Sequence, residues 1–197
     1  MRRTSALLAV AAALIFAALG VTQASAARLL FDPSGQVRSV GDLASVDVLF
    51  DPEGGGLLVG AFDITVGFDS SIVTFNSITF GSQLGDPGLF EAVTSFTPGA
   101  GSINAAETSL LVDLSGLQDG NPFPLFSLDF TAVSIGVSPL NFSFALLSDD
   151  QGLAIDPLAL TSGSITVSDI PEPSTSLLLL GGLAAAVALL RRRAWRP

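Results

Sequence analysis

Residues 60–68 read Gly-Ala-Phe-Asp-Ile-Thr-Val-Gly-Phe, and this stretch decides the fold. Its large apolar residues recur at every second position, as Phe62, Ile64, Val66 and Phe68. The alternate positions carry small or polar residues, namely Ala61, Asp63, Thr65 and Gly67. Alternation with a period of two is typical of a β-strand that is covered on one face. We therefore expect a strand here whose apolar side faces a core.

The same alternation recurs at residues 46–50, 126–132 and 140–146. In the last stretch, the residues expected on the core side are Leu140, Phe142, Phe144 and Leu146. Turn-forming sequences separate these strands, for example Asp-Pro-Ser-Gly at 32–35, Asp-Pro-Gly at 86–88 and Asp-Gly-Asn-Pro at 119–122. Residues 27–169 show no helical period. Eight or nine short strands predict an all-β domain, a sandwich of two sheets.

Charge is distributed unevenly along the 197 residues. Six of the 8 basic residues, all Arg, lie within a few residues of either end, whereas all 18 acids lie between Asp32 and Glu172. A body this acidic repels phosphate backbones, so we expect no nucleic-acid partner. The chain contains no Cys, so disulfides and thiolate metal sites are excluded.

The first 26 residues have the three parts of a secretory signal peptide. Arg2 and Arg3 precede an apolar run over residues 6–21, and Ala24-Ser25-Ala26 follows. Small residues at Ala24 and Ala26 suit the signal peptidase, so we predict an N-terminal signal helix cleaved after Ala26. An uncleaved membrane anchor is the alternative.

The C-terminal end carries a second apolar run, over residues 174–190. As a helix this run would extend about 26 Å, slightly less than a hydrocarbon core of about 30 Å. Arg191, Arg192 and Arg193 follow it, and such residues remain cytoplasmic. We predict a transmembrane helix over 174–190 and a basic cytoplasmic tail over 191–197. The acidic body, 27–169, then lies on the opposite side, in agreement with the signal peptide.

Pro171, Glu172 and Pro173 lie directly before this run, within a segment over residues 170–173. The tripeptide, the apolar run and the arginines, in this order, resemble the PEP-CTERM sorting signal of Gram-negative bacteria. The resemblance implies recognition by an exosortase, a membrane-embedded cysteine protease or transpeptidase, and removal of the tail. It also implies an inner-membrane precursor that moves to the cell surface or a biofilm matrix. A permanent membrane anchor is the alternative, but it leaves the tripeptide unexplained.

The order of the body's segments resembles a cohesin-type domain. The segments that carry the resemblance are 29–32, Val40-Gly41-Asp42, 45–50, 60–69, 72–75, 124–132, 148–152 and 163–167. The resemblance covers nearly all of residues 27–169 and implies a jelly-roll type β-sandwich. It also implies a protein partner such as a dockerin, bound through one sheet face, and kinship with carbohydrate-binding sandwiches.

Catalytic groups are poorly supplied, since the chain has no His, Cys or Lys to serve as general base or nucleophile. Paired carboxylates remain, as in glycoside hydrolysis. Asp113, Asp129 and the pair Asp149-Asp150 are the candidates, but their spacing does not select them. Acids in turns are usually solvated, so we expect a protein that is not an enzyme.

Calcium is the one cofactor that the acids suggest, because Ca²⁺ takes six to eight oxygen ligands from flexible loops. The weak candidates are Asp149 and Asp150, near Asp156, with Asp51 and Glu53 in a second loop. The chain lacks the dense acidic ligand string of known calcium loops, and Asp suits turns without a metal. We therefore assign no cofactor.

Three classes of function fit these observations. The first is an exported, non-catalytic surface or matrix protein whose sandwich binds another surface protein or an exopolysaccharide. The second is a carbohydrate-binding module, although the body lacks Trp and Tyr for stacking against sugars. The third is a secreted hydrolase that uses two carboxylates, which would require two acids facing one cleft.

Overall fold

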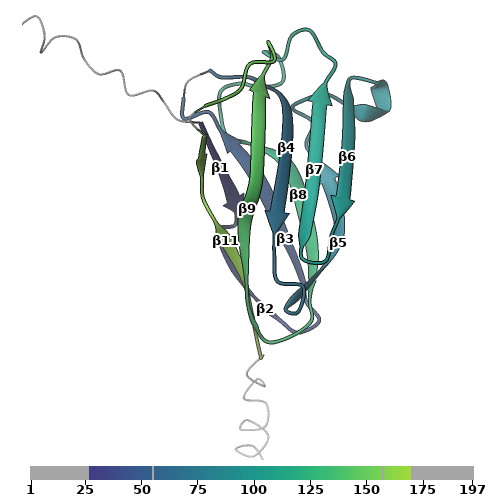
Figure 1. Cartoon of the computed structure of the whole chain (residues 1–197), viewed down its shortest axis with the longest axis vertical. Coiled ribbons are helices and arrows are strands. Elements are labelled where there is room, and N and C mark those ends of the chain that lie inside the picture. Colours follow the sequence, from purple (N-terminus) through teal and green to yellow (C-terminus); the bar gives the residue numbers. More distant parts are fainter. Residues whose placement is uncertain (1–26, 55, 157, 170–197) are drawn as a thin grey trace, which may run out of the picture.

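Two β-sheets face each other in the computed structural model, which describes residues 27–54, 56–156 and 158–169 (Figure 1). The order of the first sheet is β10 (Leu158–Leu160), β1 (Ala27–Asp32), β3 (Leu43–Asp51), β8 (Phe123–Ala132) and β5 (Val73–Phe80). The order of the second sheet is β2 (Gly35–Ser39), β11 (Gly163–Ser168), β9 (Gly136–Asp149), β4 (Val59–Gly67), β7 (Ser102–Ser109) and β6 (Ala92–Pro98). A 3₁₀ helix, η1 (Pro87–Leu89), precedes β6. The predicted all-β sandwich is confirmed.

The described residues form eleven strands, more than the eight or nine expected, and the short β2 and β10 are among the additional ones. Two of the crossings from the first sheet to the second lie between β1 and β2 and between β10 and β11. At these crossings β10 pairs in parallel with β1, and β2 pairs in parallel with β11. The other strand pairs within the described residues are antiparallel.

The core fills the space between the sheets with the residues that the alternation selects. Phe62, Ile64 and Val66 of β4 are at most 3% exposed. They face the first sheet, where Phe126 of β8 lies 5.7 Å from Phe62 between ring centroids. Burying one such side chain contributes about 1.5–3 kcal/mol. The inward residues of β3 and β8 are buried as well, so the predicted core faces of 46–50 and 126–132 are confirmed.

The prediction for residues 140–146 is wrong beyond Phe142. Thr65 pairs with Phe144 and Val66 pairs with Phe142, so Ser143 is an extra residue, a β-bulge, in β9. The Ser143 hydroxyl donates a hydrogen bond to the Thr65 carbonyl. One inserted residue moves all later side chains to the opposite face. Phe144 and Leu146 therefore point away from the core.

The described chain begins and ends at opposite ends of the sandwich (Figure 1). β1 starts at the end drawn uppermost in Figure 1, and β11 finishes at the lower end. The predicted signal helix, sorting tripeptide, transmembrane helix and basic tail lie outside the described residues. Among the residues that are described, no helix is long and apolar enough to cross a membrane.

Candidate functional site

The outer face of the second sheet carries apolar side chains that the bulge in β9 turns outward. Ala145 and Leu147 pair with the buried Ile64 and Phe62, so their side chains face the core. The intervening Phe144 and Leu146 consequently face solvent, with exposed fractions of 49% and 54%. The alternation in the sequence assigned both residues to the core side, because a bulge at a Ser has no distinctive signal in the sequence.

A hollow of about 520 Å³ lies beside Leu146 on this face. Small residues form much of its lining. Ala61 of β4 and Ala106 of β7 lie opposite the longer Thr108 and Asp63, and their short side chains leave the space open. The turn after β9 supplies Gly152 and Ala154 on one side. A second hollow of about 200 Å³ shares part of this lining and continues past Leu111 and Leu114.

Three polar side chains next to the hollow are held in fixed orientations. Asn104 of β7 donates through its Nδ2 to Asp63 Oδ1 at 2.6 Å and to Thr65 Oγ1 at 3.1 Å. All three residues are partly exposed. This outer face, made by β6, β7, β4 and β9, is therefore a pre-organised surface of apolar and polar groups, which suits recognition of a ligand.

The outer face of the first sheet is different in character. Its polar side chains pair across neighbouring strands: Ser127 donates to Asp47, Ser77 to Asp129, and Asn76 to Thr131. These groups satisfy one another, and each acid is held by a hydroxyl rather than aimed into a cleft. Asp129, one of the catalytic candidates, therefore lies in a cross-strand pair on a solvated sheet.

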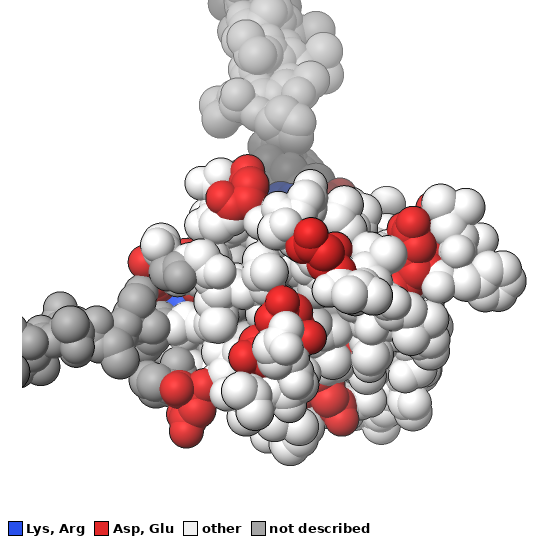
Figure 2. Space-filling view, turned by 90° about the horizontal axis from the view of Figure 1, so that it is seen from above, with Lys and Arg blue, Asp and Glu red and all other residues white. Residues whose placement is uncertain are grey.

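Two further acidic candidates, Asp113 and Asp149, accept hydrogen bonds from the backbone of turns. Asp149 Oδ1 accepts hydrogen bonds from the backbone N–H groups of Gln151 and Leu153, and Asp150 is exposed at the same turn. Asp113 accepts from the backbone of Ser115, and its pKa is lowered by the hydroxyl and N–H of that residue. Figure 2 shows the carboxylates of the upper end separated on a mostly uncharged surface. Within the described chain, no three acidic residues gather where they could hold a metal ion.

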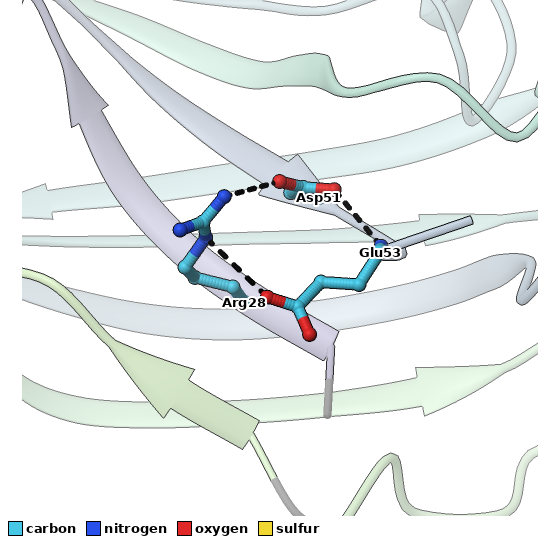
Figure 3. Close-up of polar contacts among 3 residues, drawn as sticks. All are labelled: Arg28, Asp51 and Glu53. Atoms are coloured by element: carbon cyan, nitrogen blue, oxygen red, sulfur yellow. Dashed lines mark hydrogen bonds and ion pairs between the residues drawn. The ribbon is translucent and has the colours of Figure 1, made fainter. Parts of the chain in front are cut away.

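Asp51 and Glu53, the second pair of calcium candidates, contact a cation of the protein itself (Figure 3). Arg28 donates to Asp51 Oδ2 at 2.6 Å, and its Nε lies 3.9 Å from Glu53 Oε1. Asp51 also accepts from the backbone N–H of Glu53. The hydrogen bond from Arg28 lowers the pKa of Asp51 below its ordinary value. The arginine ties the start of β1 to the end of β3 and to the residues that follow it.

Glu107 is an unusual residue that the sequence reading did not single out. It lies on the same face of β7 as Ile103 and Ala105, two residues after Ala105, and this period of two is the signal that could have identified it. It is 1% exposed, and neither carboxyl oxygen has a hydrogen-bond partner. Burial raises the pKa of Glu107 to about 7. Its side chain faces the core, away from the outer face of the sheet.

Residues 169–193 match a family model described as the PEP-CTERM protein-sorting motif. This match coincides with the predicted tripeptide, apolar run and arginines, which include Pro171, Glu172 and Pro173 and Arg191, Arg192 and Arg193. The chain therefore carries a PEP-CTERM sorting motif at its C-terminal end. No curated protein matches the sequence significantly.

Solved structures of cohesins match the body. A structure of a type I cohesin–dockerin complex from Clostridium thermocellum has a TM-score of 0.61 at 15% identity, over 74% of this chain and 95% of that chain. A type I cohesin from Pseudobacteroides cellulosolvens gives 0.60 at 14% identity, over 75% and 96%. A non-cellulosomal cohesin from the archaeon Archaeoglobus fulgidus gives 0.54 at 12%, over 77% and 96%. The body thus has a cohesin-like fold.

Proposed function

We propose that the chain is an exported, non-catalytic protein of the cell surface or extracellular matrix. In this proposal residues 1–26 direct export and are removed after Ala26, and residues 174–190 hold the precursor in the inner membrane of a Gram-negative cell. An exosortase recognises Pro171, Glu172 and Pro173 and removes the tail. The sorting motif at 169–193 supports this sequence of events.

The body binds a partner protein through the outer face of β6, β7, β4 and β9. The observation that carries this assignment is the contrast between the two outer faces. One face presents Phe144 and Leu146 beside a hollow and a fixed polar cluster, whereas the other satisfies its polar groups across its own strands. Aromatic and aliphatic side chains next to oriented polar groups are typical of protein interfaces.

The cohesin-like fold supports a protein as the class of partner that we propose. A solved structure with the same fold is described as a complex of a type I cohesin with a dockerin. A dockerin-like protein is therefore the first partner that we propose for this face. The separation of the carboxylates in Figure 2 supports a binding rather than a hydrolytic role.

A polysaccharide ligand is the second candidate, because Phe144 offers an exposed ring on the same face as the amide of Asn104. Cross-strand pairing places Phe144 opposite Thr65, and Thr65 opposite Asn104. Sugars combine stacking against aromatic rings with hydrogen bonds to such polar groups. An exopolysaccharide would occupy the same face as the protein partner.

A pull-down with variants of the body, altered on the outer face of the second sheet, tests the proposed site. Phe144→Ser combined with Leu146→Ser should abolish capture of the partner protein from a surface extract of the native host. Leu160→Ser is the matched control, since Leu160 is 48% exposed but lies in the first sheet. Capture that survives the double substitution contradicts the assignment. Binding to a glycan array, lost in the same variant, would instead favour the polysaccharide.

A further inference from the structure

The lower end of the sandwich exposes six aliphatic side chains, which we call the lower tip. They are 43–70% exposed and are Val37, Val40, Leu43, Val133, Ile135 and Val137. Isolated exposed aliphatic residues are ordinary on a protein surface, whereas a contiguous group indicates a contact surface.

Hydrogen bonds and strand pairing show that the lower tip is contiguous. The turn between β2 and β3 is joined to the end of β8, because Gly41 donates to the Ala132 carbonyl and Ala132 donates to the Asp42 carbonyl. Val37 and Val137 both pair with Thr166 of β11, so they flank Thr166 on the same outer face. The β2–β3 turn, the β8–β9 turn that carries Val133 and Ile135, and the adjoining strand ends thus form one surface.

The chain leaves the sandwich through this tip. Ser168 of β11 pairs with Ser39, immediately before the turn that carries Val40. Four residues, 170–173, separate the last described residue, Asp169, from the apolar run that starts at Ser174. Fully extended, that connection spans at most about 17 Å.

This tether is short compared with the sandwich. The 14 residues of β9 extend roughly 45 Å along the molecule. If the run from Ser174 lies in the bilayer, the upper end cannot reach the membrane surface while the lower end stays away from it. The lower tip is therefore the part of the body that faces the lipid.

Charged groups near the tip include one cation, Arg38, and the acids Asp42, Asp69 and Asp169. Arg38 donates to the carbonyls of Val37 and Leu43, and among the described residues no carboxylate lies within ion-pair distance of it. Asp42 is engaged by the backbone N–H of Ser39, and Asp69 by Ser71. Aliphatic side chains beside an arginine suit the boundary between lipid tails and phosphates.

We propose that the lower tip docks on the bilayer surface while the precursor is held in the membrane. The tip then orients the sandwich upright, with the upper loops directed away from the membrane. This inference rests on the proposed membrane-held precursor, and the partner that it names is the lipid surface.

Site-specific fluorescence on the full chain tests the docking. Because the chain has no Cys, Ile135→Cys and Val112→Cys each provide a single labelling site for an environment-sensitive dye. Val112 is the matched control, as an aliphatic residue 98% exposed in the loop that follows β7 at the upper end. Both variants are reconstituted in vesicles of phosphatidylethanolamine and phosphatidylglycerol, with and without a spin-labelled lipid that quenches at headgroup depth.

Docking predicts a blue-shifted emission at residue 135 and severalfold stronger quenching by the spin-labelled lipid than at residue 112. Equal quenching at the two positions overturns the inference. A blue shift at residue 135 that depends on protein concentration and ignores the lipid quencher also overturns it, in favour of a second copy at the tip. Flotation of the same vesicles tests the proposed precursor separately, since a chain that does not float with lipid contradicts the membrane-held state itself.

Discussion

At the scale of single residues, Glu107 places a carboxyl group among apolar side chains with no partner for either oxygen. Desolvation penalises the ionised form, which is why its pKa rises to about 7. As pH rises, the unfolded chain ionises first, near the ordinary glutamate pKa of about 4.3. The folded protein is therefore progressively destabilised between that pH and about 7, and the full cost persists above it.

Replacing this carboxyl by an amide should remove that pH dependence. We expect the stability of Glu107→Gln relative to the wild type to increase by roughly 3–4 kcal/mol between acidic and alkaline conditions. Chemical denaturation of both proteins across this pH range measures the difference. Asp150→Asn, at an exposed acid, is the control for loss of one charge. A stability difference between the two proteins that stays constant with pH would contradict the raised pKa of Glu107.

Sequence could anticipate part of this residue-scale picture. The alternation of Ile103, Ala105 and Glu107 predicts that all three side chains share one face of a strand. Which face is buried depends on the cross-strand neighbours Phe62 and Ile64, and these pairings are long-range. The hydrogen bonds from Asn104 to Asp63 and Thr65 depend on the same register, so the polar cluster of the outer face could not be predicted locally.

At the scale of elements, β9 shows how a single inserted residue changes a surface. Before Ser143 the strand follows the expected alternation, and Phe142 stacks on Phe31 with ring centroids 4.4 Å apart. After it, the alternation continues on the opposite side. The stretches 46–50 of β3, 62–66 of β4 and 126–132 of β8 were predictable because their buried residues keep a period of two. The bulge has no Gly or Pro to mark it, so the outward orientation of Phe144 and Leu146 was not predictable from the sequence.

Two phenylalanines that flank the bulge provide a direct test of it. Phe142→Ala should destabilise the protein by about 3 kcal/mol, because it removes a ring packed against the core. Phe144→Ala should cost less than about 1 kcal/mol, since its ring is half exposed on the outer face. Thermal and urea unfolding compare the two variants. Equal losses of stability would mean that β9 keeps a continuous register and that the outer face lacks its aromatic group.

At the scale of the whole molecule, the chain combines a cohesin-like body with a sorting motif at one end. The body starts at Ala27, which is buried at the beginning of β1, directly after the predicted cleavage site. It ends at the lower tip, next to the residues that the sorting motif begins with. The composition of the C-terminal end predicted the sorting motif, because its tripeptide, apolar run and arginines are adjacent in the sequence. The signal peptide and the membrane span, which are defined by local hydrophobicity and charge, stay predictions. The partner was not predictable, since it depends on an assembled surface.

The tripeptide is the proposed determinant of processing. Substituting Pro171→Ala, Glu172→Ala and Pro173→Ala together should leave the precursor in the membrane fraction with its tail attached, because the flanking prolines keep Glu172 extended and accessible. Immunoblotting of membrane and surface fractions from the native host measures the distribution. Wild-type surface delivery by the triple variant would instead support an ordinary membrane anchor.

The most direct test of the proposed export and sorting is mass spectrometry of the mature protein isolated from its native host. The proposal predicts a polypeptide from the cell surface or matrix that begins at Ala27 and lacks the apolar run from Ser174 onward. An intact polypeptide from Met1 to Pro197, recovered from the cytosol, would contradict it.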